Sequence, residues 1–181
     1  MSQSPIPKVR FSSSQIESAY REISIRLHSD EAQRAFKRGI CKLQDRLHRI
    51  FVQGIRRPSP SQAAEAGERI RGQLDKSAEI LNSAVSEASD SLTNAGVHDL
   101  GVSCSTPLIL AVKVFTPYAK RYLELLGKYD QMILSLEKMA QYGLISTETV
   151  LKEKETAKKA VLYVDNLVRD LDNPRCAKSK K

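Results

Sequence analysis

The chain has 181 residues, 41% of them hydrophobic, and carries a formal net charge of +8 at pH 7 with a pI near 9.5. This length and apolar content suffice for one folded domain or two small ones, and they exclude a wholly disordered chain. The basic balance favours a polyanionic partner, with nucleic acid first. The alternative is an ordinary basic protein with a solvated surface.

The charge is unevenly spread along the chain. Residues 1–60 carry a net +7, residues 61–104 a net −4 and residues 105–181 a net +5. The N-terminal stretch MSQSPIPKVRF lacks the apolar core of a signal peptide, and the longest apolar run, LILAVKVF at 108–115, is too short to span a bilayer. We therefore expect a cytoplasmic protein that does not contact a membrane.

The first 40 residues combine a loose arm with a short strand. Residues 1–14 are rich in proline and serine, and Lys8 and Arg10 make this arm basic. Within REISIRLHSDEAQRAF the pattern alternates between apolar and polar residues, which predicts a strand at 22–28. One face of that strand carries Ile23, Ile25 and Leu27 and is expected to face the core. The other face carries Ser24, Arg26 and His28.

A long helix is expected to follow from residue 30 to about 54. Ser29 is a suitable N-cap, and Asp30 and Glu31 suit the positive end of the helix dipole. A basic stripe runs along this helix at a spacing of four residues: Arg34, Arg38, Lys42 and Arg46. Such a stripe is either a solvated face or a rail that faces phosphates.

The middle of the chain predicts a linker and a second long helix. GIRRPSPSQ at 54–62 contains the glycine and prolines that end one helix and precede another. The helix at 62–95 has a seam rich in alanine, which suits close helix packing, and an acidic surface. We expect it to support the fold or an interface and not to read DNA.

The C-terminal part repeats the same order of elements. A strand is expected at 108–115, a helix at 117–142 that begins at Thr116 and Pro117, a GLIS turn with Gly143 at C′, and a helix at 147–172 capped by Ser146 or Thr147. Residues 174–181 form a basic tail that we expect to be disordered. The predicted organisation is a single helical domain over 15–173 with two short strands.

Catalytic and metal-binding motifs are missing from the sequence. It has no P-loop, no GxSxG, no HExxH and no GxGxxG. Cys41, Cys104 and Cys176 form no CxxC pair, and the histidines have no ligand-spaced neighbours. We therefore expect no enzyme activity, no metal and no cofactor. His48 is expected to lie on the surface of its helix.

The order strand, helix, turn, helix occurs twice, and each strand must pair to satisfy its backbone groups. Pairing across a two-fold axis of a dimer would give a two-stranded ribbon on a helical base, which the major groove of DNA can admit. The two strands can instead pair with each other and expose Arg26 and Lys113. A third interpretation makes both strands purely structural in an α+β domain.

Two blocks of the sequence resemble a known family. IRLHSDEAQRAFKRG and VFTPYAKRYLELLGKYDQMILSLEKMAQYGLIS, with Asp130 in the middle of the second, resemble a family found on integrating conjugative elements. Within it they look most like the AcaB-type transcriptional activators of IncC-type conjugative plasmids. The resemblance covers roughly 22–40 and 107–165 and does not extend to the segment between them. It implies a dimeric ribbon-helix-helix DNA-binding activator of conjugative transfer genes. The helix at 117–142 departs from that pattern because it is about twice the usual length.

The expected fold is therefore mainly α with short β-strands, a ribbon-helix-helix-like core extended by long helices. Its expected partners are double-stranded DNA, a second copy of the chain and RNA polymerase. The residues expected to bind DNA are Arg26 and Lys113 at base edges with Ser24 and His28 beside them, Arg34, Arg38, Lys120 and Arg121 at phosphates, and Ser146 and Thr147 at a helix N-terminus. The alternative is a helical accessory protein of a conjugation or DNA-processing complex that reads no promoter.

Overall fold

The computed structural model of the chain describes residues 19–53, 60–97 and 107–173. The elements are β1 (Arg21–Leu27), α1 (Asp30–His48), a π-helical turn η1 (Arg49–Gln53), α2 (Pro60–Asn94), β2 (Leu108–Val114), α3 (Pro117–Gln141) and α4 (Thr147–Asp172). Both predicted strands and all four predicted long helices are confirmed, with ends shifted by one or two residues except where η1 continues α1. The predicted arm and tail lie outside the described residues.

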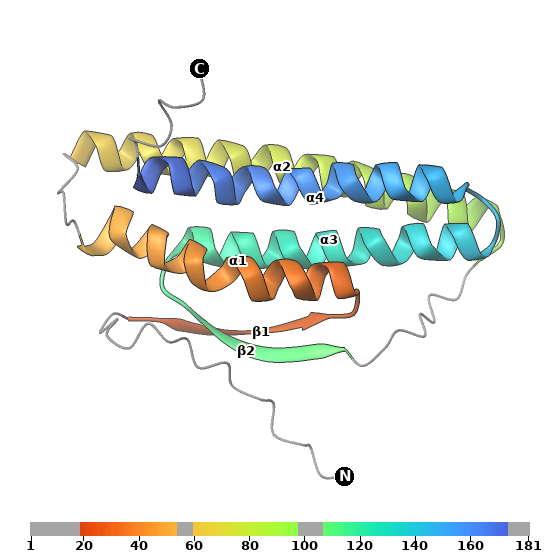
Figure 1. Cartoon of the computed structure of the whole chain (residues 1–181), viewed down its shortest axis with the longest axis horizontal. Coiled ribbons are helices and arrows are strands. Elements are labelled where there is room, and N and C mark those ends of the chain that lie inside the picture. Colours follow the sequence, from red (N-terminus) through yellow and green to blue (C-terminus); the bar gives the residue numbers. More distant parts are fainter. Residues whose placement is uncertain (1–18, 54–59, 98–106, 174–181) are drawn as a thin grey trace, which may run out of the picture.

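The molecule is built in three layers (Figure 1). The β1–β2 ribbon forms one outer layer, α1 and α3 form the middle layer, and α2 and α4 form the other outer layer. Both strands pack on α3, while α2 and α4 pack on each other and on the middle helices. No helix in the described part of the chain is long and apolar enough to cross a membrane.

The ribbon forms within a single chain. β1 and β2 are antiparallel, with Arg21 opposite Val114, Ser24 opposite Ala111 and Leu27 opposite Leu108. The sequence allowed the strands to pair either across a dimer or with each other. In the structure they pair with each other and so satisfy each other's backbone hydrogen-bonding groups. The expected pairing of equivalent strands from two chains is therefore not needed to build the ribbon.

The two halves of the chain are related by a constant offset. The N-caps Ser29 and Thr116 lie 87 positions apart, and so do the directly paired residues Ser24 and Ala111. An antiparallel pair whose central residues are also equivalent has an approximate local two-fold axis through that pair. Packing follows the same relation, because α2 of the first half packs on α3 of the second and α4 packs on α1.

Local sequence signals explain the helix starts and the α3–α4 turn. The Ser29 hydroxyl accepts a hydrogen bond from the Ala32 amide at 3.3 Å, and the Thr116 hydroxyl accepts one from the Ala119 amide at 3.2 Å. Gly143 ends α3 with a φ of +68°, a conformation that favours glycine, and the Leu144 amide then reaches the Met139 carbonyl at 2.9 Å. This closes the predicted GLIS turn.

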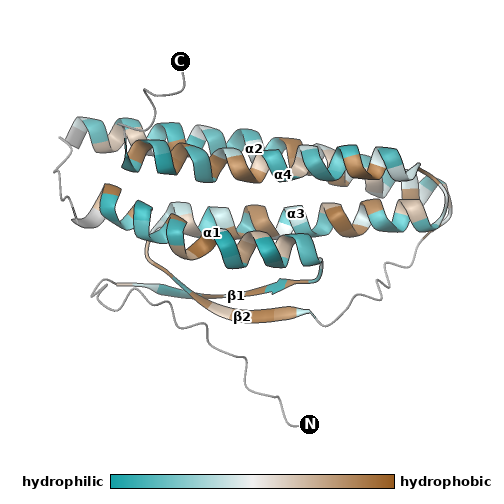
Figure 2. Ribbon diagram, in the orientation of Figure 1, coloured by the Kyte–Doolittle hydropathy of each residue, from teal (hydrophilic) through white to brown (hydrophobic). Residues whose placement is uncertain are grey.

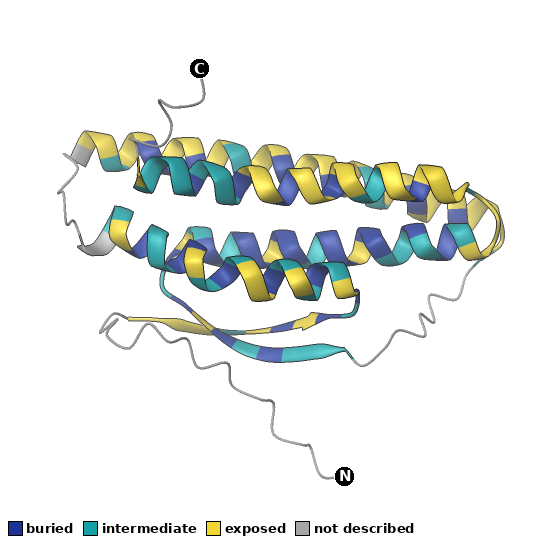
Figure 3. Cartoon of the chain, viewed as in Figure 1, coloured by how far each residue is buried: buried dark blue, intermediate teal, exposed yellow. Residues whose placement is uncertain are grey.

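The main core lies between the layers and is mostly aliphatic. Figure 2 shows apolar residues on the inner helix faces and on the ribbon, and Figure 3 shows that buried residues follow the same faces. In the ribbon, Ile25, Leu27, Leu110, Val112 and Val114 are buried against the helices. The expected inner face of β1 is thus confirmed, with Ile23 half-buried beside it.

Candidate nucleic-acid interface

The outer face of the ribbon carries the polar residues that the sequence pattern singled out. Residues directly opposite each other share a face, so the outer face holds three pairs. These pairs are Glu22 with Lys113, Ser24 with Ala111, and Arg26 with Ile109. The four polar members are exposed, while Ala111 and Ile109 are half-buried. The structure thus brings Ser24, Arg26 and Lys113 together on one surface.

The cations of this face are disposed diagonally. Arg26 lies near one end of the ribbon and Lys113 near the other, opposite Glu22. The Lys113 Nζ lies 4.1 Å from the centre of the Tyr20 ring, a cation–π contact, and Tyr20 is 53% exposed. Arg26 forms no ion pair with another residue that the structure describes. This face carries two cations, Arg26 and Lys113, and one carboxylate, Glu22, so it is weakly basic.

The link between β1 and α1 is fixed by a buried carboxylate from α3. Asp130 accepts hydrogen bonds from the His28 amide at 2.9 and 3.1 Å, from the Ser29 amide at 2.7 Å and from the Ser29 hydroxyl at 2.7 Å. Asp130 is 4% exposed. These contacts join the two blocks of the family resemblance, and they hold the half-buried His28 at the end of the ribbon.

The basic stripe of α1 is divided between surface and interior. Arg34, Arg38 and Lys42 are exposed, and the Arg34 Nε donates to the Asp30 carbonyl of its own helix at 3.1 Å. Arg46 instead pairs with Asp165 of α4 at 3.0 Å and is partly buried. Three of the four cations are therefore available to a phosphate, while the fourth ties α1 to α4.

Lys120 and Arg121 lie in the first turns of α3 and both have acidic neighbours. Lys120 pairs with Glu124 on the same helix at 3.3 Å, and Arg121 pairs with Asp75 of α2. Exposed pairs of this kind are weak and are exchanged easily for a phosphate. The Arg121 pair also joins two helices, which gives that residue a structural role.

Ser146 and Thr147 lie away from the ribbon. The start of α4 is at the end of the bundle and beyond the end of the ribbon (Figure 1). The reason is the length of α3, whose 25 residues extend about 37 Å at 1.5 Å per residue. The Ser146 hydroxyl already accepts from the Thr149 amide at 3.2 Å, and Glu148 adds a negative charge to the first turn. Both features weigh against a bound phosphate.

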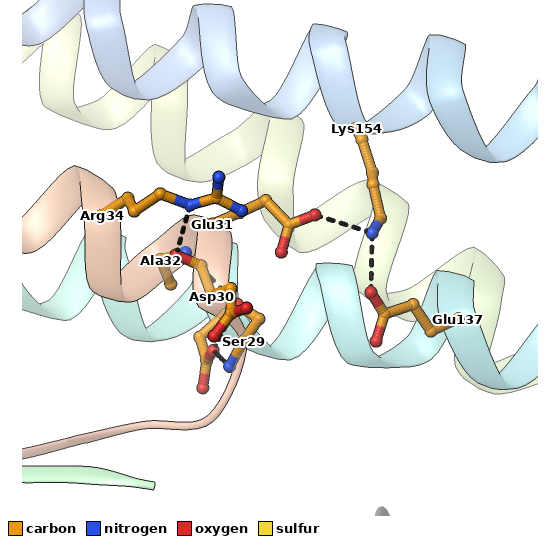
Figure 4. A network of polar contacts seen from close by, with 8 residues as sticks. Ser29, Asp30, Glu31, Ala32, Arg34, Glu137 and Lys154 are labelled. Carbon is orange, nitrogen blue, oxygen red and sulfur yellow. Dashed lines mark hydrogen bonds and ion pairs between the residues drawn. The ribbon is translucent and has the colours of Figure 1, made fainter. Parts of the chain in front are cut away.

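A three-residue ionic network joins the two halves near the N-cap Ser29 (Figure 4). Lys154 of α4 donates to Glu31 of α1 at 2.9 Å and to Glu137 of α3 at 2.6 Å. Burial opposes charge on both Glu31 and Lys154, but their mutual hydrogen bond and attraction prevail. The pKa of Glu31 is consequently lowered and the pKa of Lys154 is raised.

Two buried polar residues of α1 were not expected. His48 is only 4% exposed and lies edge-on to Phe115, so the prediction of a surface position was wrong. Gln44 is equally buried, and neither its Oε1 nor its Nε2 has a hydrogen-bond partner among the described residues. Both follow Ile40 at intervals of four, and this spacing places them on a buried face of the helix. No group of acidic, histidine or cysteine residues in the described part could hold a metal ion.

Comparison with known proteins identifies the family. No curated protein matches the sequence. A crystal structure of selenomethionine-containing AcaB from uropathogenic E. coli has the same fold, with a TM-score of 0.74 and 12% identity over 86% of this chain and 80% of that one. The family model for the transcriptional regulator AcaB matches residues 63–168. This match includes the middle segment, where no resemblance was noted, and leaves out 22–40. Because it covers more than half of the sequence, the chain belongs to the AcaB family of transcriptional regulators.

Proposed function

We propose that this protein is a sequence-specific DNA-binding activator of conjugative transfer genes that inserts its β1–β2 ribbon into the major groove. The observation that carries the proposal is the exposed outer face of the ribbon, with Arg26 and Lys113 on one surface and an apolar face beneath. The family supports a role in transcription. Activation and the transfer genes rest on the sequence resemblance alone.

The dimensions of the ribbon suit the groove. The major groove is about 12 Å wide and admits a two-stranded ribbon. Adjacent strands lie about 4.8 Å apart, so side chains on the outer face can reach base edges on both sides. An arginine such as Arg26 can donate two hydrogen bonds to one guanine, and a lysine such as Lys113 can donate to the same acceptors. This is the ribbon-helix-helix mode of reading, here on longer helices.

Cations beside the ribbon would add affinity without specificity. Arg34, Arg38 and Lys42 line the exposed side of α1, which follows directly from β1. We assign them, with Lys120 and Arg121, to phosphates. Ser146 and Thr147 contribute only if the duplex continues past the ribbon.

Partners beyond DNA are a separate matter. The expected homodimer was inferred from the need for a second strand, and in this chain β2 meets that need. Self-association would therefore bring two complete ribbons to DNA instead of building one. An activator must also contact RNA polymerase, and the acidic, exposed surface of α2 lies on the side away from the ribbon, where such a contact would not compete with DNA.

The test selects DNA from a random-sequence duplex library and compares the selected duplex with a scrambled duplex at fixed salt. We expect the affinity for the selected duplex to exceed that for the scrambled duplex by a large ratio. Arg26→Ala and Lys113→Ala should each lower this ratio by a factor that corresponds to about 1–3 kcal/mol. Lys120→Ala should weaken both duplexes alike and reduce the salt slope by about one. Lys159→Ala, an exposed cation on α4 in the layer opposite the ribbon, is the matched control and should change neither.

Equal affinity for all duplexes would instead favour the accessory protein. Unchanged specificity in both ribbon variants would rule out the ribbon as the reading element, even if the protein bound DNA specifically through another surface.

A further inference from the structure

We propose that a single chain reads a non-palindromic DNA site in one fixed orientation, because its ribbon joins two strands that are equivalent in position and different in sequence. This inference rests on the proposed function. It adds the stoichiometry, the symmetry of the site and the part of the site that each end of the ribbon reads.

The equivalence of position follows from the offset of 87. That offset relates the N-caps Ser29 and Thr116 and the paired residues Ser24 and Ala111. It also places Lys113 at the position that corresponds to Arg26, and Ile109 at the position that corresponds to Glu22. A ribbon with this symmetry presents its two strands to DNA in the same way, as two identical chains would.

The single chain already supplies what such a ribbon requires. All seven residues of β1 have a partner in β2. The inner face of the ribbon is buried by helices of the same chain, with Leu27 and Val112 fully inaccessible to solvent. A second chain is therefore needed neither to pair the strands nor to cover their apolar face.

The two strands differ in what they can recognise. The outer face of β1 presents Glu22, Ser24 and Arg26, and that of β2 presents Ile109, Ala111 and Lys113. A carboxylate accepts a hydrogen bond from a cytosine amino group, whereas apolar side chains contact the thymine methyl group. Because opposite residues lie at the same end of the ribbon, we infer that the end with Glu22 and Lys113 reads G·C pairs, and that the end with Arg26 and Ile109 reads a guanine beside a thymine.

The register of the two strands also sets the distance between Arg26 and Lys113 along the ribbon. Arg26 and Lys113 lie in rows four residues apart along the ribbon. At about 3.4 Å per residue this is about 14 Å, comparable to three to five base pairs at about 3.4 Å each. The bases read by the two cations should be separated by that number of base pairs within one groove.

The experiment enriches duplexes from a random library with the full chain and counts chains per duplex by native mass spectrometry. We expect an asymmetric motif and one chain for each copy of it. Arg26→Ala should relax base preference at one end of the motif and Lys113→Ala at the other, each by about 5- to 150-fold. Lys159→Ala is again the control.

A second variant tests the symmetry argument directly. Glu22→Ile, Ser24→Ala and Arg26→Lys together give β1 the outer face of β2, so this triple variant should select a palindrome. The changes lie on the outer face and should leave the core intact, which a melting curve checks. Lys113→Arg alone alters only one base contact and should keep the motif asymmetric.

The outcomes separate the two proposals. Absence of any enriched sequence overturns the proposed function and this inference with it. A wild-type palindrome no longer than one ribbon, about seven base pairs, bound by two chains, overturns the inference and leaves the function standing. An inverted repeat of two asymmetric copies, with one chain on each, supports it.

Discussion

The β1–α1 half and the β2–α3 half of this protein share one geometry and use different chemistry to hold it. Each half has a seven-residue strand, two residues between the strand and the first helical residue, and a hydroxyl N-cap. In the first half the strand–helix link donates hydrogen bonds to Asp130. In the second, Phe115 of the link packs edge-on against Tyr20 and His48.

The offset of 87 sharpens this contrast. The position that corresponds to Asp130 in the first half is Leu43, which is 1% exposed. A carboxylate on α3 therefore anchors the first link, while the equivalent position on α1 holds an apolar side chain. Approximate symmetry of the backbone therefore does not require symmetry of the interactions.

The largest expected effect comes from removing the carboxylate at the first link. In Asp130→Asn, an NH2 group replaces one carboxylate oxygen and turns a donor toward the His28 amide, while the remaining oxygen, which accepts from Ser29, is no longer charged. We expect a loss of about 3 kcal/mol in the free energy of unfolding, or about 6–12 °C in Tm. Urea unfolding measures the first quantity and calorimetry the second.

The control is Asp170→Asn on α4, a partly exposed aspartate whose ion pair with Arg169 spans 3.5 Å. It should change stability by less than about 0.5 kcal/mol. Equal effects of the two substitutions would show that the Asp130 contacts do not anchor the first half.

The two N-caps give a matched comparison of intermediate size. Thr116→Ala removes one bond, from the Ala119 amide, and should cost about 1 kcal/mol. Ser29→Ala removes the equivalent bond and also the hydroxyl that donates to Asp130, so it should cost about 2 kcal/mol. Denaturant unfolding of both variants gives the difference. If Thr116→Ala cost more than Ser29→Ala, the conclusion that polar contacts hold mainly the first link would be wrong.

Local signals in the sequence predicted the elements well. The alternation in 22–28, the caps Ser29 and Thr116 and the glycine at 143 each act within a few residues, so their consequences can be worked out without a fold. The sequence also placed Ser24, Arg26 and Lys113 on one candidate surface, because period-two alternation decides which side chains share a face once the strands pair.

Contacts between distant residues could not be predicted in the same way. Asp130 was noted within a motif, but its partners His28 and Ser29 lie about 100 residues earlier in the chain. His48 was expected on the surface because a histidine in a helix is usually exposed, and only the packing of Phe115 beside it shows otherwise. Two cations considered for phosphates, Arg46 and Arg121, instead meet acidic partners on other helices that no local pattern specifies.

The Lys154 network provides the next prediction, because it links Glu31 of the first half to the second. Lys154→Gln should cost about 1.5 kcal/mol near neutral pH, between the values for exposed and buried pairs. The stabilisation from Glu31 exists above its ordinary pKa of 4.5 and is lost as the pH falls through its lowered pKa. The stabilisation from Lys154 is complete below 10.5 and is lost as the pH rises through its raised pKa.

The difference between wild type and Lys154→Gln should therefore be largest between about pH 5 and 10 and should shrink in acid below 4.5. Urea unfolding at pH 3, 4 and 7 checks this. Lys158→Gln, which breaks an exposed pair with Glu155 on α4, should show a small difference at each pH. A pH-independent cost would mean that Lys154 stabilises the protein by packing alone.

The smallest expected effect again compares equivalent positions. Gln44 of α1 is buried with no hydrogen-bond partner among the described residues, whereas Gln131, 87 positions later, is exposed on α3. Replacing an unsatisfied buried amide with an apolar side chain of similar size removes a desolvation cost. Gln44→Leu should raise the free energy of unfolding by about 1 kcal/mol. Gln131→Leu should change it by less than about 0.5 kcal/mol, since that side chain is solvated in both states. If Gln44→Leu lowered stability instead, the buried Gln44 amide would have to be hydrogen-bonded in solution. The first half would then have a second buried polar contact besides its hydrogen bonds to Asp130.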